Sequence, residues 1–175
     1  MIIEVCAESY QYAVKAEKAG ADRIELCKDL HLDGLTPKYE YAKKTIDSLN
    51  IPVFILIRPR KGDFIYSDEE FELMKSDIVK FKEMGCKGIV SGVLNDDNSI
   101  DIKRTKELVE LSRPLEFTFH RAFDIIINPL KEIENLIELG IDRVLTSGQK
   151  EKAIDGLVLI EQLNNISNNR IIIMP

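Results

Sequence analysis

Short runs of β-branched and other apolar residues alternate with amphipathic helical patterns from one end of this chain to the other. The runs that read as strands occupy residues 2–6, 23–27, 53–58, 88–92, 116–120, 143–147 and 171–174. Helical patterns lie between successive runs, and glycines end several of them. Alternation of strand and helix is typical of βα units on a parallel sheet. The sequence therefore predicts an α/β fold.

A recurring segment supports a repeated βα unit. Residues 20–24 (GADRI), 85–89 (GCKGI) and 140–144 (GIDRV) each place a helix-stopping glycine shortly before the start of a strand. Recurrence at this scale indicates repeated supersecondary units, although the period is not strict.

Seven strands and six helices predict a TIM-type (β/α) barrel whose eighth unit is missing. Such barrels typically need about 250 residues, and this chain has 175. We expect residues 1–175 to form a single barrel domain that is incomplete at its C-terminus. An open doubly wound sheet is the alternative, and the absence of G-x-G-x-x-G after the first strand weakens it.

Capping residues predict where several helices begin. Ser9 is a suitable cap for the first helix, and Ser67 with Glu70 forms the pattern of a capping box. Thr36 followed by Pro37 predicts the start of the second helix.

Charge and cysteine content exclude several classes of protein. The formal net charge is −6, which argues against a nucleic-acid-binding domain. The apolar runs are too short for a membrane span, and an odd count of three cysteines argues against a disulfide-built secreted domain. With no signal-peptide pattern at the start, we expect a cytoplasmic protein whose thiols stay reduced.

Strand alternation predicts which polar side chains point into the barrel. Successive side chains of a strand face opposite sides, so Glu4 shares a face with Cys6, and Glu25 with Cys27. Polar residues also gather at the carboxyl ends of the strands, which form the functional face of this architecture. We expect Glu25 to form an ion pair with Arg58 there, because a buried charge needs a partner.

Cys6 and Cys27 are the candidate metal ligands. They end neighbouring strands on one face, and neighbouring strands lie about 4.8 Å apart. Two thiolates at this spacing suit a soft ion such as Cu(I), and a disulfide is also allowed. The alternative is that each is a small apolar filler, as we expect for Cys86. His31, in the loop after the second strand, is a ligand or general base or else a solvated loop residue.

Two segments are candidate anion sites. Arg58 and Arg60 follow the third strand, and arginine forks suit carboxylate or phosphate oxygens. Internal salt bridges of these arginines are the alternative. Ser147 and Gly148 lie in a turn before a helix, a second place where an anion can bind.

The same residues allow an enzymatic alternative. Glu25, or His120 oriented by Asp124, would move protons while Arg58 and Arg60 hold a small carboxylate or phosphate substrate. Asp124 has a competing structural interpretation, in which it caps the turn that follows the strand. Whether the protein is an enzyme stays open.

Eight segments in order resemble the CutC family. They are residues 4–6 (EVC), 20–27 (GADRIELC), 34–37 (GLTP), 57–60 (IRPR), 62–64 (GDF), 66–68 (YSD), 118–124 (TFHRAFD) and 145–148 (LTSG). The resemblance implies a TIM-type barrel, a cytoplasmic location and a role in copper handling. It also implies that Cys6 and Cys27 match the family's proposed copper ligands.

Family members continue past the strand that matches residues 171–175, into a glycine-rich turn and an eighth strand. We therefore expect this chain to be a fragment or truncated form. The first and seventh strands would then be open sheet edges, whose unpaired backbone groups favour self-association.

Overall fold

The computed structural model describes residues 2–175, and its fold is of the α/β TIM type, as predicted. The described residues form seven strands: β1 (Glu4–Ala7), β2 (Arg23–Leu26), β3 (Val53–Leu56), β4 (Gly88–Ser91), β5 (Glu116–Phe119), β6 (Arg143–Leu145) and β7 (Ile172–Met174). They also form six α-helices: α1 (Tyr10–Lys18), α2 (Tyr39–Ser48), α3 (Asp68–Glu83), α4 (Ile102–Ser112), α5 (Pro129–Glu138) and α6 (Leu157–Ser167). None of the helices within residues 2–175 has the length and apolar character needed to cross a membrane.

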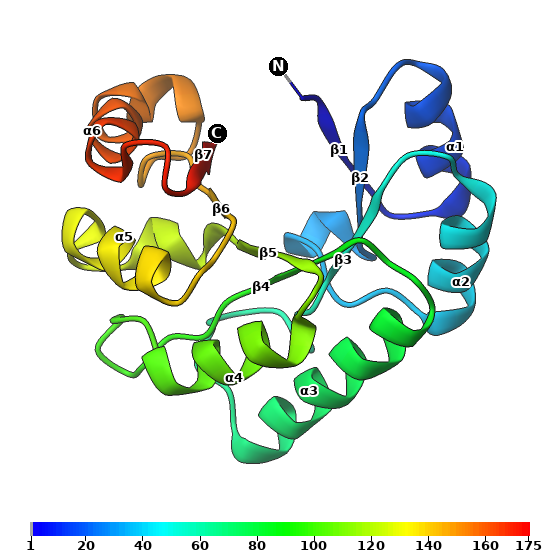
Figure 1. Cartoon of the computed structure of the whole chain (residues 1–175), viewed down its shortest axis with the longest axis horizontal. Helices are drawn as coiled ribbons and strands as arrows, with labels where there is room; N and C mark the ends of the chain where they lie inside the picture. The colour runs from blue at the N-terminus through cyan, green and yellow to red at the C-terminus, as the bar shows by residue number, and fades with distance from the viewer. Residues whose placement is uncertain (1) are drawn as a thin grey trace. The chain divides into compact units, whose positions relative to one another are not determined.

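The chain divides into two compact units, and the first contains β1 to β4. It comprises the residues up to Asp63 together with Ser67–Val90. Its strands are parallel and follow chain order, so β2 lies between β1 and β3. Helices α1 and α2 pack side by side against this part of the sheet (Figure 1). This order is what consecutive βα units produce.

The second unit contains β5, β6 and β7. It comprises Phe64–Tyr66 and Ser91–Pro175. The strands are parallel, with Thr118 opposite Arg143 and Arg143 opposite Ile172. Helices α5 and α6 pack against each other beside these strands (Figure 1).

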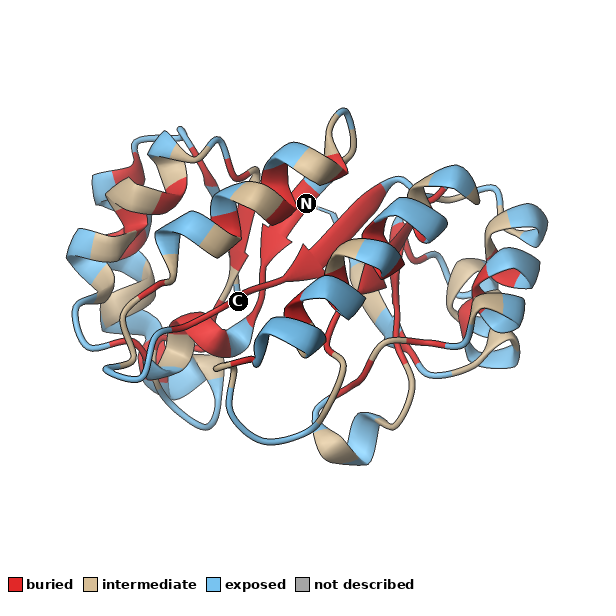
Figure 2. Cartoon of the chain, turned by 90° about the horizontal axis from the view of Figure 1, so that it is seen from below, coloured by how far each residue is buried: buried red, intermediate tan, exposed pale blue. Residues whose placement is uncertain are grey.

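Strand burial follows the pattern of a covered parallel sheet. Every residue of β2, β3 and β4 is buried, whereas the helices alternate buried and exposed positions (Figure 2). Parallel strands covered on both faces have this pattern. In the first unit, Cys27, Phe54, Leu56 and Val90 form one buried cluster. Cys27 therefore shares a face with Phe54 and Leu56, in agreement with strand alternation.

Two predicted helix caps are confirmed. The Ser9 hydroxyl accepts a hydrogen bond from the Tyr12 backbone N–H at 3.3 Å, and α1 begins at Tyr10. Ser67 and Glu70 form the reciprocal capping box at the start of α3. These local signals involve only neighbouring residues, so tertiary contacts do not override them.

The predicted start of α2 is wrong. The helix begins at Tyr39, and its N-cap residue Lys38 gives no side-chain hydrogen bond. The Thr36 hydroxyl instead accepts the backbone N–H of Arg58 at 2.8 Å. The Thr36 side chain, which the local pattern assigned to a helix cap, therefore binds a residue far away in the sequence instead. A 3₁₀ helix, η3 (Ala153–Gly156), directly precedes α6.

Candidate functional site

Cys27 lies at the carboxyl end of β2, buried against β1. Only 2% of the residue is exposed, and its thiol donates a hydrogen bond to the carbonyl of Ala7. Cys6 lies within β1 and is exposed to solvent. Both cysteines belong to the first unit, and alternation places them on the same face of their strands. The three cysteines of the chain are free.

The register of β1 and β2 places Cys6 and Cys27 further apart than two residues directly opposite each other on neighbouring strands. Cys6 is paired with Glu25, so Cys27 lies two residues further along β2. With about 4.8 Å between strands and about 3.3 Å of rise per residue, the two Cα atoms are about 8 Å apart. Disulfides need Cα atoms closer than about 7 Å, so a disulfide between Cys6 and Cys27, which the strand spacing alone allowed, does not fit this register.

Both thiols hold their protons strongly. Burial raises the pKa of the Cys27 thiol to about 12, and nearby carboxylates add to the shift, namely those of Glu25, Glu8 and Asp29. Desolvation of the Cys6 sulfur, followed by the charges of Glu25 and Cys27, raises its pKa well above the usual range, although part of the residue is open to solvent. At neutral pH both are neutral thiols, and a thiolate forms only if another cation replaces the proton.

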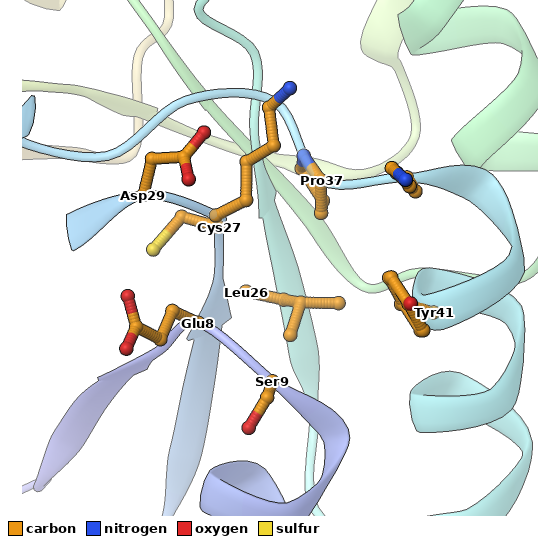
Figure 3. A pocket seen from close by; sticks show the side chains of 9 residues that line it. Glu8, Ser9, Leu26, Cys27, Asp29, Pro37 and Tyr41 are labelled. Atoms are coloured by element: carbon orange, nitrogen blue, oxygen red, sulfur yellow. The ribbon is translucent and has the colours of Figure 1, made fainter.

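A cavity of about 270 Å³ opens beside Cys27 (Figure 3). In this view the Cys27 sulfur lies between the carboxylates of Glu8 and Asp29. The cavity is lined by Glu8, Ser9, Leu26, Cys27, Lys28, Asp29, Pro37, Lys38 and Tyr41. Sequence reasoning did not select Glu8 or Asp29, although both follow strand ends closely. Within residues 2–175, no group of three or more His, Cys, Asp or Glu side chains is arranged to hold a metal ion.

Glu25 is a buried carboxyl group with a strongly shifted pKa. Burial raises its pKa to about 8, Glu4 raises it further, and Arg23 opposes the shift. Its Oε2 atom is buried without a hydrogen-bond partner. The predicted ion pair with Arg58 does not form between these two described residues. Arg23 lies two residues before Glu25 in β2, and it forms an ion pair with Glu4.

The arginines of the first candidate anion site are engaged within the chain. The guanidinium of Arg58, which is 4% exposed, donates to backbone carbonyls of Leu32, Gly34 and Gly62. Arg60 forms ion pairs with Glu70 at 2.7 Å and with Asp63 at 2.8 Å. These contacts favour the alternative of internal interactions over an open anion site.

In the second unit, Asp124 binds the turn that follows β6. Its Oδ1 accepts the Thr146 hydroxyl at 2.5 Å and the backbone N–H groups of Ser147 and Gln149 at 3.0 and 3.1 Å. Burial favours a higher pKa for Asp124. The hydrogen bonds, led by those from Thr146 and Arg121, outweigh burial and hold the pKa below its usual value.

The predicted anion site at Ser147 and Gly148 therefore already holds an anion of the chain itself. The Gly148 N–H donates to the Thr146 hydroxyl at 3.0 Å, and the flanking N–H groups donate to Asp124. Gly148 has a φ of +68°, and a Cβ there would collide with the backbone of Gly156. The turn is a backbone anion site filled by a carboxylate.

His120 and Asp124 do not form the predicted proton relay. His120 follows β5 and is buried, and its Nδ1 accepts the Ala122 backbone N–H at 3.3 Å. Its ring packs on Phe64 with 4.7 Å between ring centres. The Asp124 carboxylate binds the turn instead, and between these two described residues there is no hydrogen bond. His31 is exposed in a 3₁₀ helix, η1 (Leu30–Leu32), as expected for a solvated loop residue.

Comparisons with solved structures agree with this fold. CutC from Streptococcus agalactiae superposes with a TM-score of 0.93 and 35% sequence identity, over 99% of this chain and 86% of that one. An aldolase superposes with a TM-score of 0.70 at 13% identity, over 99% of this chain and 77% of its own. The second match shows the fold alone.

Sequence comparisons identify relatives along the whole chain. A Homo sapiens copper homeostasis protein cutC homolog is 47% identical over 99% of this chain. A CutC family protein from Pasteurella multocida is 45% identical over 99% of this chain and 71% of its own length. The chain spans 64% of the length of the human relative. The model of the CutC family matches residues 1–175, and the chain is therefore a member of the CutC family.

Proposed function

We propose that this chain binds Cu(I) through thiolates of Cys6 and Cys27, as a cytoplasmic copper-homeostasis protein. The observation that carries the proposal is the placement of two thiols on one face of β1 and β2, in acidic surroundings. Relatives of the chain are named as copper homeostasis proteins, which supports the choice of metal. Soft thiolate ligands favour Cu(I) over the hard cations.

The electrostatics around Cys27 support a cation. The carboxylates of Glu8 and Asp29 disfavour a bare thiolate, and their negative charge favours any positive charge placed at the sulfur. Glu25 adds to this field once it loses its own proton. In binding, two S–H bonds lose their protons and two Cu–S bonds form, so one Cu(I) replaces two protons. Copper keeps its oxidation state in this exchange.

The separation of the cysteines is compatible with a bridging metal. A metal ion between two sulfurs spans a greater distance than a direct S–S bond does. The register that excludes a disulfide therefore still allows a two-coordinate Cu(I) site.

A competition titration tests the proposal. Reduced protein is titrated with Cu(I) against a chelator, without oxygen, and compared with the variant carrying Cys6→Ser and Cys27→Ser. Cys86→Ser is the matched control, because Cys86 is buried outside this pair. We expect the double variant to lose the competing site and the control to keep it. Equal binding by the parent and the double variant would contradict the proposal.

We also propose that the chain self-associates through its sheet edges. Among the described strands, β1 pairs only with β2 and β7 only with β6. Ile172 in β7 is 55% exposed, so this edge strand carries apolar surface. Such an edge is a template for pairing with another chain.

A second candidate function, an enzyme acting on a small anion, rests on Glu25. A buried carboxyl group with a pKa of about 8 can exchange a proton near neutral pH, as a general acid or base must. Arg58 would hold the anion and Asp124 would orient His120, and both roles stay predictions because both side chains bind other groups of the chain. A thermal-shift screen of small carboxylates and phosphates tests this candidate. A stabilising ligand whose effect vanishes in Glu25→Gln would favour it over copper binding.

A further inference from the structure

A short closed loop lies next to Cys27. We call residues 29–34 the Cys27 loop. The loop is closed by two backbone hydrogen bonds, from Lys28 N to Leu35 O at 2.9 Å and from Leu35 N to Lys28 O at 2.8 Å. Two of its residues, Asp29 and Asp33, have φ values of 53° and 63°, so the loop holds a specific, tightly turned conformation.

The end of the Cys27 loop lies close to the Cys27 side chain. A Cβ placed on Gly34 would lie 2.8 Å from Leu56 Cδ2 and 3.6 Å from Cys27 Sγ. A Cβ there would require the end of the Leu56 side chain to shift, and the φ of +82° favours glycine. The Gly34 backbone is therefore one of the groups that lie beside the Cys27 side chain.

Arg58 binds the loop at the same place. Its Nη1 donates to the carbonyls of Leu32 and Gly34 at 2.9 and 3.1 Å, while Nη2 donates to Gly62 at 2.9 Å. Hydrogen bonds from an ionised donor are stronger than neutral ones. A planar guanidinium reaches these separate carbonyls at once, which a lysine ammonium does not match in geometry.

We infer that Arg58 is a positioning residue that holds the Cys27 loop closed over the Cys27 thiol and so limits the access of soft metal ions and electrophiles to it. The guanidinium acts through Gly34. Releasing its bonds to Leu32 and Gly34 frees the segment that covers the sulfur, while the β1–β2 pairing that positions Cys27 stays intact. The consequence for copper rests on the proposed function, whereas the consequence for thiol access does not.

Thiol modification kinetics test this inference. In a Cys6→Ser, Cys86→Ser background Cys27 is the single thiol, and its reaction with a small neutral maleimide is followed under native conditions. We expect the Cys27 thiol to react at least about tenfold faster in Arg58→Ala and Arg58→Lys, because the loop opens locally once the guanidinium no longer binds it. Arg60→Ala is the matched control, since Arg60 binds Asp63 and Glu70 and not the Cys27 loop. Its rate should stay within about twofold of the background protein.

A readout beyond folding separates positioning from general destabilisation. Rates are measured at several low urea concentrations and compared with the urea dependence of global unfolding. A weak urea dependence in Arg58→Ala, with slowing by added methylguanidinium, indicates local opening of the loop. If the faster reaction follows global unfolding, or if Arg58→Ala reacts no faster than Arg60→Ala, the inference is wrong.

The Cu(I) titration distinguishes this inference from the proposed function. Fast maleimide labelling in Arg58→Ala without Cu(I) binding by the parent protein would uphold the loop inference and remove the copper proposal. Cysteine-dependent Cu(I) binding with equal labelling rates with and without Arg58→Ala would uphold the copper proposal and remove the loop inference.

Discussion

The thiol of Cys27 donates a hydrogen bond to the backbone carbonyl of Ala7, with 3.8 Å between sulfur and oxygen. The Cys27 backbone N–H donates to the same carbonyl at 3.0 Å, so this oxygen fixes both the backbone and the side chain of the cysteine. A thiol that donates must keep its proton, in agreement with its raised pKa of about 12. Copper has to displace that proton before it can bind.

Cu(I) affinity should therefore rise with pH. Both thiols have pKa values above neutrality, so each binding event between pH 6 and pH 8 releases two thiol protons. Each released proton contributes up to about tenfold in affinity per pH unit. Competition titrations at pH 6, 7 and 8 check this, with the pH dependence of the chelator measured separately. An affinity that is constant over this range would show that the thiols are not the ligands.

Glu25 should make the protein less stable as pH rises. Its pKa is about 8 in the folded state, against an ordinary value of 4.5, so the folded protein binds more protons between these values. The stabilisation is complete below pH 4.5 and falls through pH 8, by up to about 1.4 kcal/mol per pH unit. Urea unfolding at pH 5 and pH 8 should show this slope in the parent and in the exposed control Glu40→Gln, and a flatter one in Glu25→Gln. Equal slopes in all three proteins would contradict the prediction.

Asp124 should be replaceable by an external anion. Asp124→Ala removes the carboxylate that binds Thr146, Ser147 and Gln149, at an expected cost of about 2–3 kcal/mol in the free energy of unfolding. The freed N–H groups then form an open anion site. Sulfate should raise the melting temperature of Asp124→Ala more than that of the parent, relative to chloride at equal ionic strength. The same increase in both proteins would mean that the turn does not bind anions.

Self-association should depend on the exposed edge of β7. Ile172→Lys places a charge on that edge and should shift the protein toward monomer, because charged edges disfavour strand pairing. Val158→Lys is the control, since Val158 is 73% exposed but lies on α6. Light scattering over a concentration series measures the change. A parent protein that is monomeric at every concentration would contradict the proposed association.

The fold was predictable because its signals are local and repeated. Helix-stopping glycines, the Ser9 cap and the Ser67 capping box act over a few residues, so the sequence indicates them directly. The strand faces were predictable for the same reason, because alternation fixes the side to which each residue points.

Register and hydrogen-bond partners were not predictable in this way. Alternation assigns Cys6 and Cys27 to one face, but the offset between their strands depends on how β1 and β2 pair. The partners of Arg58 are backbone carbonyls, which every residue carries and no motif marks. Its interaction with the Cys27 loop became apparent only in three dimensions.

X-ray absorption of the copper-loaded protein tests the Cu(I) site most directly, because it reports which atoms surround the metal. We expect one Cu(I) per chain with two sulfur neighbours. Cys27→Ser should reduce the sulfur coordination, and Cys86→Ser should leave it unchanged. Copper surrounded by nitrogen or oxygen, or sulfur coordination that survives the loss of both Cys6 and Cys27, would contradict the proposed site.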